Sequence, residues 1–295
     1  MNGVVRSVAV KSLDEVSVMR LLLICALTVA IAGASSPAIA GPARPRVKHA
    51  PIKVYRDEKG DPLRTIDGAL VNQIWSGYAL PEFETGNLFT SAQATWTVPA
   101  VSYEGVEALS ASWVGIGGFC ENSECDPVDQ TLIQLGTAQA ALTAKKTEYW
   151  AWYEMLPKFS IPTKLKVKPG DVITASLSCA GICTGKQKWT LSMTNETTGK
   201  SWHKHVTYKS SKLSAEWIEE APSSRGGVFP LADFGTATFT QSMANAASAD
   251  LSTGDSLIME DPNGQSSNVS APNLTENGFN ACFSPDSTLA TCDSP

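Results

Sequence analysis

The chain of 295 residues carries a formal net charge of −6 at pH 7, and this charge is unevenly distributed. Residues 1–40 sum to +1, residues 41–64 to +4 and residues 65–295 to −11. Nucleic-acid binding depends on clustered Lys and Arg that contact phosphates, and no such cluster follows residue 64. The composition therefore argues against a nucleic acid as partner.

The first 40 residues have the layout of a secretory signal peptide. An apolar run, Leu21 to Ala34, follows Arg20, and the small-residue triplet Ala38-Ile39-Ala40 closes the segment. The run is too short to span a hydrocarbon core of about 30 Å, which disfavours the alternative of a membrane anchor. We expect cleavage after Ala40, a secreted or periplasmic mature protein, and no membrane partner. A start at Met19 would make residues 1–18 an extension.

Cysteine usage agrees with an oxidising compartment. Cys25 lies in the predicted signal, which leaves an even number of cysteines, and these form three close couples. Six cysteines allow 15 connectivities. The spacing favours three local disulfides: Cys120–Cys125, Cys179–Cys183 and Cys282–Cys292.

Residues 41–70 form a segment of their own in the predicted organisation. The stretch 41–64 is rich in proline and basic residues and has no hydrophobic periodicity, so it cannot bury a core by itself. One interpretation is a solvated linker. The other is a propeptide whose positive charge docks on the acidic body until low pH protonates the carboxylates.

Residues 71–295 are predicted to form one all-β domain. Alternating apolar and polar residues indicate strands at 88–98 and 188–194, the second followed by a turn at 195–199. The runs 164–167 and 172–179 are predicted as strands joined by a tight turn at Pro169-Gly170-Asp171. No convincing amphipathic helix appears, which favours a sandwich or a barrel. The tail after Ala246 keeps apolar residues and stays in the domain.

Several common catalytic patterns are absent from the sequence. His203 and His205 would share one strand face, but no nearby Cys or Asp completes a metal site, so a surface pair is the simpler interpretation. No HExxH, GxSxG, Asp-Thr-Gly or Asp-Ser-Gly occurs. The stretch from Gly181 to Gly185 superficially fits a cysteine nucleophile elbow, but a disulfide-closed turn explains it better. We expect no metal and no cofactor.

Seven segments, in order, resemble the glutamic peptidase (eqolisin) family of secreted acid proteases. They are Asn72-Gln73-Ile74-Trp75-Ser76-Gly77-Tyr78, Ala94-Thr95-Trp96-Thr97-Val98-Pro99, Ser112-Trp113-Val114-Gly115-Ile116-Gly117-Gly118, Leu132-Ile133-Gln134-Leu135-Gly136-Thr137, Ala151-Trp152-Tyr153-Glu154, Ala215-Glu216-Trp217-Ile218 and Leu231-Ala232-Asp233-Phe234-Gly235. The resemblance covers roughly residues 72–240. Seven such segments in the family's order are a strong signal.

The resemblance implies a two-sheet antiparallel β-sandwich of lectin-like (concanavalin-like) type with endopeptidase activity. It places Gln134 and Glu216 at the positions of the catalytic pair. A glutamate stays partly ionised in acid and can take a proton from water, while an amide keeps its charge state and donates N–H groups to an oxyanion. No covalent intermediate is then needed. Polypeptide substrates, the protein's own propeptide and a monomeric state complete the expectation.

The resemblance also implies that Trp113, Glu154 and Trp152 line or support the substrate cleft. Trp150 and Trp152 would share one face of their strand and Tyr149 and Tyr153 the other, and the sequence leaves open which face is core and which is cleft.

The main departure from the family pattern is Gly117, which stands where an aspartate is common and removes an acidic group expected near the pair. Met155 and Leu156 also replace common aromatic residues. The competing hypothesis is a non-catalytic β-sandwich that binds carbohydrate or protein, for which eight tryptophans would suit sugar stacking.

Overall fold

The computed structural model describes residues 46–181, 183–275 and 277–295, which belong to one compact unit. The predicted signal peptide, the cleavage after Ala40 and the start of segment 41–70 lie outside the described residues. No helix in the described part is long and apolar enough to cross a membrane.

Strands make up nearly all of the regular structure. The strands of five or more residues are β2 (Trp75–Pro81), β3 (Ser91–Thr97), β4 (Ala108–Gly117), β5 (Leu132–Thr143), β6 (Lys146–Met155), β8 (Val172–Cys179), β9 (Lys188–Asn195), β10 (Lys200–Thr207), β11 (Ser214–Glu220), β14 (Thr236–Ala244), β16 (Ser256–Glu260) and β18 (Phe279–Ser284). The shorter elements are β1 (Leu70–Asn72), α1 (Glu82–Thr85), β7 (Ile161–Pro162), β12 (Ser223–Ser224), β13 (Gly227–Val228), β15 (Ala247–Ser248), η1 (Thr253–Asp255) and β17 (Ser266–Val269).

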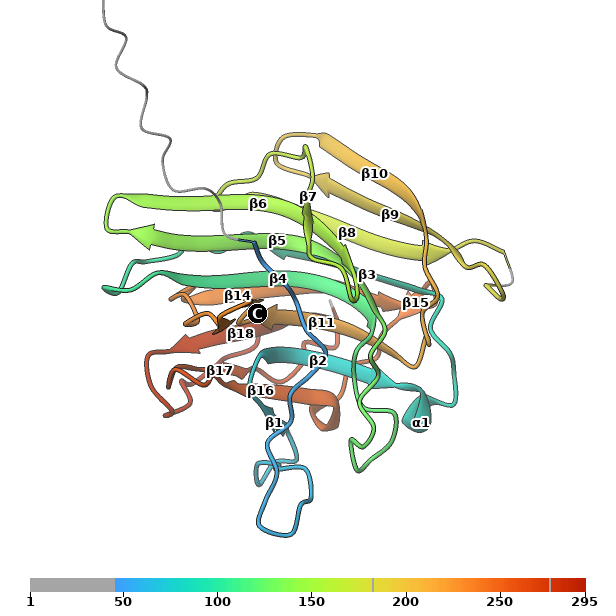
Figure 1. The fold of residues 1–295 in the computed structure, drawn as a ribbon, viewed down its shortest axis with the longest axis horizontal. Helices are drawn as coiled ribbons and strands as arrows, with labels where there is room; N and C mark the ends of the chain where they lie inside the picture. The colour runs from blue at the N-terminus through green and yellow to red at the C-terminus, as the bar shows by residue number, and fades with distance from the viewer. Residues whose placement is uncertain (1–45, 182, 276) are drawn as a thin grey trace, which may run out of the picture. The chain divides into compact units, whose positions relative to one another are not determined.

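The strands form one long hydrogen-bonded ladder that folds over on itself into a sandwich. Its order is β10-β9-β8-β3-β14-β18-β17-β16-β2-β11-β4-β5-β6-β7, and β1 adds to β16 in parallel. In Figure 1, β6, β5 and β4 lie side by side across the upper part of the molecule. One layer therefore runs from β10 to β14 and the other from β2 to β6, with β16, β17 and β18 joining them.

A hydrophobic core fills the space between the two layers. The indole Nε1 of Trp96 on β3 donates to Thr137 Oγ1 on β5 at 3.0 Å, and Nε1 of Trp217 on β11 donates to the Gln93 carbonyl on β3 at 2.7 Å. Both side chains are fully buried. These bonds satisfy the polar edge of each ring and fix how the layers lie against each other.

A second hydrophobic cluster covers the outer face of β11, β4, β5 and β6. It contains Trp75, Trp113 and Trp152 together with Val47 and Ile52 from the N-terminal segment, defined here as residues 46–64. Figure 1 shows this segment, in blue, crossing the strands at a steep angle. Because the outer face is covered as well, every residue of β4 is buried.

Most of the sequence-based elements are present. Strands β3, β8 and β9 lie where alternation predicts them, the tail contributes β15 to β18, and all three predicted disulfides are present. The Cys179–Cys183 bond closes the turn that superficially fits a nucleophile elbow.

The strand predicted at 164–167 is wrong, because the chain there is irregular. Side chains satisfy two main-chain groups of this run: Leu165 N donates to Thr163 Oγ1 at 3.2 Å, and the Lys166 carbonyl accepts from Asn195 Nδ2 at 3.1 Å. At these two groups a side chain takes the place of a ladder partner.

Candidate active site

The predicted catalytic residues lie in one row across four strands. Glu154 on β6 pairs with Gln134 on β5, Gln134 with Gly115 on β4, and Gly115 with Glu216 on β11. Residues directly opposite each other on antiparallel strands point to the same face of the sheet. The side chains of Glu154, Gln134 and Glu216 therefore share the outer face, on the side where the N-terminal segment lies.

Gly115 separates the two residues of the pair. Neighbouring strands are about 4.8 Å apart, so Gln134 and Glu216 are separated by roughly twice that at the backbone and face each other over a position without a side chain. A Cβ at residue 115 would lie 2.8 Å from Cζ3 of Trp113 and 3.2 Å from Cβ of Gln134. The glycine thus leaves the space that the pair needs.

The polar atoms of the pair have no hydrogen-bond partner among the residues that the structure describes. Gln134 and Glu216 are fully buried, and neither the Oε1 and Nε2 atoms of Gln134 nor the two carboxylate oxygens of Glu216 form a hydrogen bond within the described residues. A buried polar group left unpaired costs about 1–3 kcal/mol, so such atoms call for an explanation in a native fold. A water molecule and a peptide carbonyl are partners of suitable size and polarity.

Burial raises the pKa of Glu216 well above its ordinary value. The charge of Asp129 raises it further, whereas the Ser214 hydroxyl and the Gly117 N–H, which lie near the carboxylate without forming a hydrogen bond to it, favour the ionised form and lower it. In the covered cleft, Glu216 therefore holds its proton over a wider pH range than a glutamate in water.

The carboxyl group of Asp129 lies next to Gly117, the position at which an aspartate is common in the family. Gly117 has a φ of +90°, and a Cβ there would lie 2.4 Å from the Thr131 carbonyl oxygen and 2.9 Å from Asp129 Oδ2. Asp129 is 3% exposed and accepts hydrogen bonds from Ser211 Oγ and from Gly118 N at 3.3 Å. A carboxylate thus remains near Glu216 although position 117 is a glycine.

The tryptophans that the resemblance places in the cleft lie on the same outer face as the pair. Trp113 packs edge-on against Trp75 at 5.1 Å between ring centroids. Trp150 and Trp152 belong to the outer cluster, whereas Tyr153 belongs to the core between the layers and Tyr149 packs against it. The structure thereby shows which face of β6 packs in the core and which faces the cleft, a choice that sequence alternation alone leaves open.

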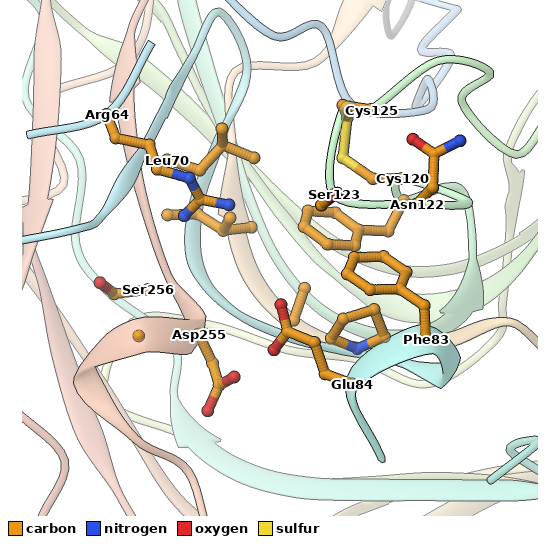
Figure 2. Close-up of a pocket in the computed structure, with 15 residues that line it drawn as sticks. Arg64, Leu70, Phe83, Glu84, Cys120, Asn122, Ser123, Cys125, Asp255 and Ser256 are labelled. Atoms are coloured by element: carbon orange, nitrogen blue, oxygen red, sulfur yellow. A yellow bond between two sulfur atoms is a disulfide. The ribbon is translucent and has the colours of Figure 1, made fainter. Parts of the chain in front are cut away.

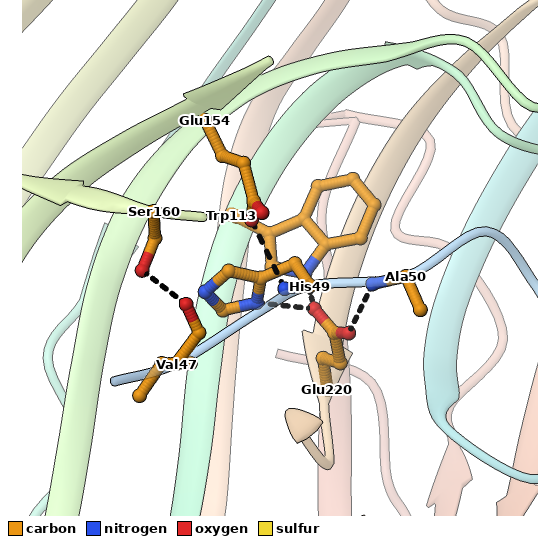
Figure 3. A network of polar contacts seen from close by, with 7 residues as sticks. All are labelled: Val47, His49, Ala50, Trp113, Glu154, Ser160 and Glu220. Carbon is orange, nitrogen blue, oxygen red and sulfur yellow. Dashed lines mark hydrogen bonds and ion pairs between the residues drawn. The ribbon is translucent and has the colours of Figure 1, made fainter. Parts of the chain in front are cut away.

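The N-terminal segment occupies this face through His49, which sequence reasoning set aside as part of the segment. The His49 ring stacks on Trp152 with 3.6 Å between centroids, and its Nδ1 lies 2.6 Å from Glu220 Oε2. Its main-chain N–H donates to Glu154 Oε2 at 3.0 Å (Figure 3). Trp113 Nε1 donates to the same Glu220 oxygen at 2.8 Å.

Glu220 is the second site residue that the sequence did not reveal. It lies four positions after Glu216 on β11, so strand alternation places both side chains on one face. This alternation is the sequence signal that could have identified Glu220 as a site residue. Burial raises the pKa of the neighbouring Glu154 to about 9; the His49 N–H and the charge of Lys48 lower it, and the charge of Glu220 raises it. Two carboxyl groups thus contact His49, Glu220 at the ring and Glu154 at the main-chain N–H.

A pocket continues the outer face beyond Glu216. Ala79 on β2, which pairs with Glu216, lines it together with Phe83, Glu84 and Arg64 (Figure 2). The Cys120–Cys125 disulfide and Asp255 complete much of its wall. The face that carries the pair is therefore hollowed on the side of Glu216 away from Gln134.

In the part of the chain that the structure describes, no group of three His, Cys, Asp or Glu side chains is arranged to hold a metal ion. His203 and His205 are exposed on β10, with 6.2 Å between ring centroids, far in the strand order from the row that contains Gln134.

Comparison with known proteins identifies relatives of this chain. A family model described as the Peptidase A4 family matches residues 73–279. Aspergillopepsin-2 of Aspergillus niger is 26% identical over 210 residues, covering 63% of this chain and 69% of that protein. Scytalido-glutamic peptidase, solved with a transition state analog inhibitor, matches with a TM-score of 0.53 and 22% identity over 72% of this chain and 98% of its own.

Aspergilloglutamic peptidase from Aspergillus niger gives a TM-score of 0.43 at 22% identity, covering 60% of this chain and 99% of its own. The β-sandwich fold is shared with the scytalido enzyme, and the family match extends over most of the chain. The hypothesis of a non-catalytic binding domain is thereby set aside. The chain belongs to the Peptidase A4 (eqolisin) family and is a glutamic endopeptidase.

Proposed function

We propose that this peptidase is secreted, works at acid pH and cleaves peptide bonds with water activated by Gln134 and Glu216. The observation that carries the proposal is the row in which both side chains, buried and with no hydrogen-bond partner in the described part of the chain, face each other over Gly115. Two hydrogen-bonding side chains on opposite sides of one open position suit the binding of a water and a peptide carbonyl.

The proposed reaction has two proton transfers. The Glu216 carboxylate takes a proton from water as the water oxygen attacks the peptide carbonyl carbon. The Gln134 amide donates N–H to the oxygen that becomes negative in the tetrahedral intermediate. Glu216 then returns the proton to the departing nitrogen as the C–N bond breaks, which leaves a free carboxyl and a free amine.

The raised pKa of Glu216 fits an enzyme that is inactive while its cleft is covered. The main cause of the shift is burial, and the N-terminal segment contributes to the cover of this face. A protonated Glu216 cannot act as the base. Removal of the cover would admit water, which favours the carboxylate and brings its pKa back toward the acid range.

We propose further that segment 41–70 is a propeptide that blocks the cleft until acid releases it. Val47, His49 and Ile52 are buried on the outer face, which a solvated linker would not require. Specific contacts hold the segment, since Arg56 donates to the carbonyl oxygens of Glu124 and Cys125 and not to carboxylates.

The test is an assay of the purified full-length protein with a denatured protein substrate at pH 3–4. We expect cleavage that neither pepstatin nor metal chelators inhibit, with a new N-terminus near residues 65–75. The isosteric change Glu216→Gln should abolish activity, and Gln134→Ala should reduce it by at least a hundredfold, because oxyanion donors contribute about 10²–10³ in rate. Activity that survives Glu216→Gln would overturn the mechanism.

A further inference from the structure

The residues around His49 form a pocket that suits a flat ring with an N–H group at its edge. The imidazole is completely buried and lies parallel to the Trp152 indole, with an interplanar angle of 6° and 3.6 Å between centroids. Its Nδ1 is 2.6 Å from Glu220 Oε2, close enough for a charge-assisted hydrogen bond. A flat ring with an N–H at its edge fits both features at once.

The main chain of the segment is held by contacts that do not depend on its sequence. His49 N donates to Glu154 Oε2 at 3.0 Å, Ala50 N approaches Glu220 Oε1 at 3.4 Å, and the Val47 carbonyl accepts from Ser160 Oγ at 2.8 Å. Lys48 exchanges two main-chain bonds with Ser223, at 2.8 and 2.9 Å. Any extended polypeptide has the N–H and C=O groups that these contacts use.

The contacts of His49 lie next to the row that contains Gln134 and Glu216. Glu154, which accepts the His49 N–H, pairs in register with Gln134. Farther along the segment, Ile52 N donates to the Gly118 carbonyl at 2.9 Å. Gly118 directly follows β4, at the end of the strand near Gly115. A chain that follows the path of the segment therefore passes the row of the pair between the two contacts.

We propose that Trp152, Glu220 and Glu154 form a substrate subsite for a histidine side chain, so that the uncovered enzyme prefers polypeptides with histidine at the position bound there. The N-terminal segment blocks the cleft by placing its own histidine in this subsite. This inference rests on the proposed peptidase function of the cleft.

Other side chains lose at least one of the contacts. Leucine fills space against Trp152 but offers no donor to Glu220, phenylalanine stacks without a donor, and lysine donates without a flat ring. The second ring nitrogen of His49, Nε2, is buried and has no partner within the described ranges of the chain, so recognition depends on the stacking and on Nδ1. A lost hydrogen bond to a charged group corresponds to about a tenfold or greater loss in binding.

The experiment uses the enzyme after acid removal of its own segment and a set of decapeptides of otherwise constant sequence. One position at a time carries histidine, phenylalanine, leucine or lysine, and the cleaved bond and kcat/KM are measured. We expect cleavage at a fixed offset from histidine, with kcat/KM about tenfold higher than for leucine or lysine at that position. Ratios within twofold, or cleavage with no fixed offset from histidine, would overturn the subsite.

A matched pair of variants tests the pocket itself. Glu220→Gln should bring the histidine-to-leucine ratio of kcat/KM close to one. Glu219→Gln changes the adjacent residue, which faces the core and accepts from Ser112 Oγ at 2.5 Å, and should leave that ratio unchanged. A ratio that survives Glu220→Gln contradicts the proposal. No cleavage of any peptide would instead contradict the peptidase proposal, so the two failures are distinguishable.

Discussion

At the scale of single residues, the electrostatics around Glu216 depend on Asp129. Its carboxylate lies beside Gly117 and raises the pKa of Glu216, in addition to the larger effect of burial. A neighbouring negative charge makes the ionised form of Glu216 harder to reach, so this carboxyl loses its proton only at a pH higher than it otherwise would. If Glu216 is the base, as we propose, the pH at which activity rises on the acid side is set partly by Asp129, which lies outside the row of Gln134 and Glu216.

The change Asp129→Asn removes this charge while keeping the shape of the side chain. The pKa of Glu216 should fall, and the limb on which kcat/KM rises with pH should move to lower pH. At a pH on that limb, kcat/KM expressed as a fraction of each protein's own plateau should be severalfold higher for the variant than for wild type. The measurement is the pH profile of kcat/KM. Glu124→Gln, an exposed change in the same loop, is the control, and an unmoved limb for Asp129→Asn would contradict this role.

At the scale of elements, the strands were predictable from local patterns and the cover of the cleft was not. Alternation located β3, β8 and β9 because each strand buries one face against the core. The run 164–167 shows the same local pattern, but side chains satisfy two of its main-chain groups, which no pattern reveals. The docking of His49 against Glu220, 171 positions away, is likewise a long-range contact.

The proposed catalytic pair was also only partly predictable from local sequence. Residue resemblance pointed to Gln134 and Glu216, but their shared row depends on the register across β4, and register is a property of paired strands. Alternation along β11 was enough to place Glu220 on the face of Glu216, yet nothing in the sequence indicated which partner it meets. The compensating carboxylate of Asp129 depends on the path of a loop and was also outside the reach of the sequence.

The N-terminal segment yields the prediction at this scale. His49→Ala removes the ring stack and the contact with Glu220, which together should weaken docking by about 2–3 kcal/mol. The full-length variant should activate at least tenfold faster than wild type at a given acid pH, measured as the rate at which the new N-terminus appears. His203→Ala on exposed β10 is the control. Equal activation rates would show that His49 does not hold the segment.

At the scale of the whole molecule, buried acids make the fold more stable in acid than at neutral pH. Burial raises the pKa of Glu219 to about 7, with Ser112 and Ser110 lowering it and Glu220 raising it. A carboxyl whose pKa is higher in the folded state than in the unfolded state binds its proton more tightly when folded. Its contribution is complete below the unfolded pKa and is lost as the pH rises through about 7. Burial raises the pKa of Glu154 to about 9, so its contribution to stability is lost at a higher pH, as the pH rises through about 9.

Thermal unfolding between pH 4.5 and 8 tests this trend, with each protein in the Glu216→Gln background, which we expect to be inactive, so that self-cleavage does not interfere. A shift from 4.5 to about 7 at Glu219 corresponds to about 3 kcal/mol, because one pKa unit equals about 1.4 kcal/mol. For a domain of this size, Tm should fall by roughly 10 °C across the range from this residue alone. Glu219→Gln carries no titrating proton at that position, so its Tm should fall less steeply. Parallel curves for the two proteins would show that Glu219 is not the group responsible.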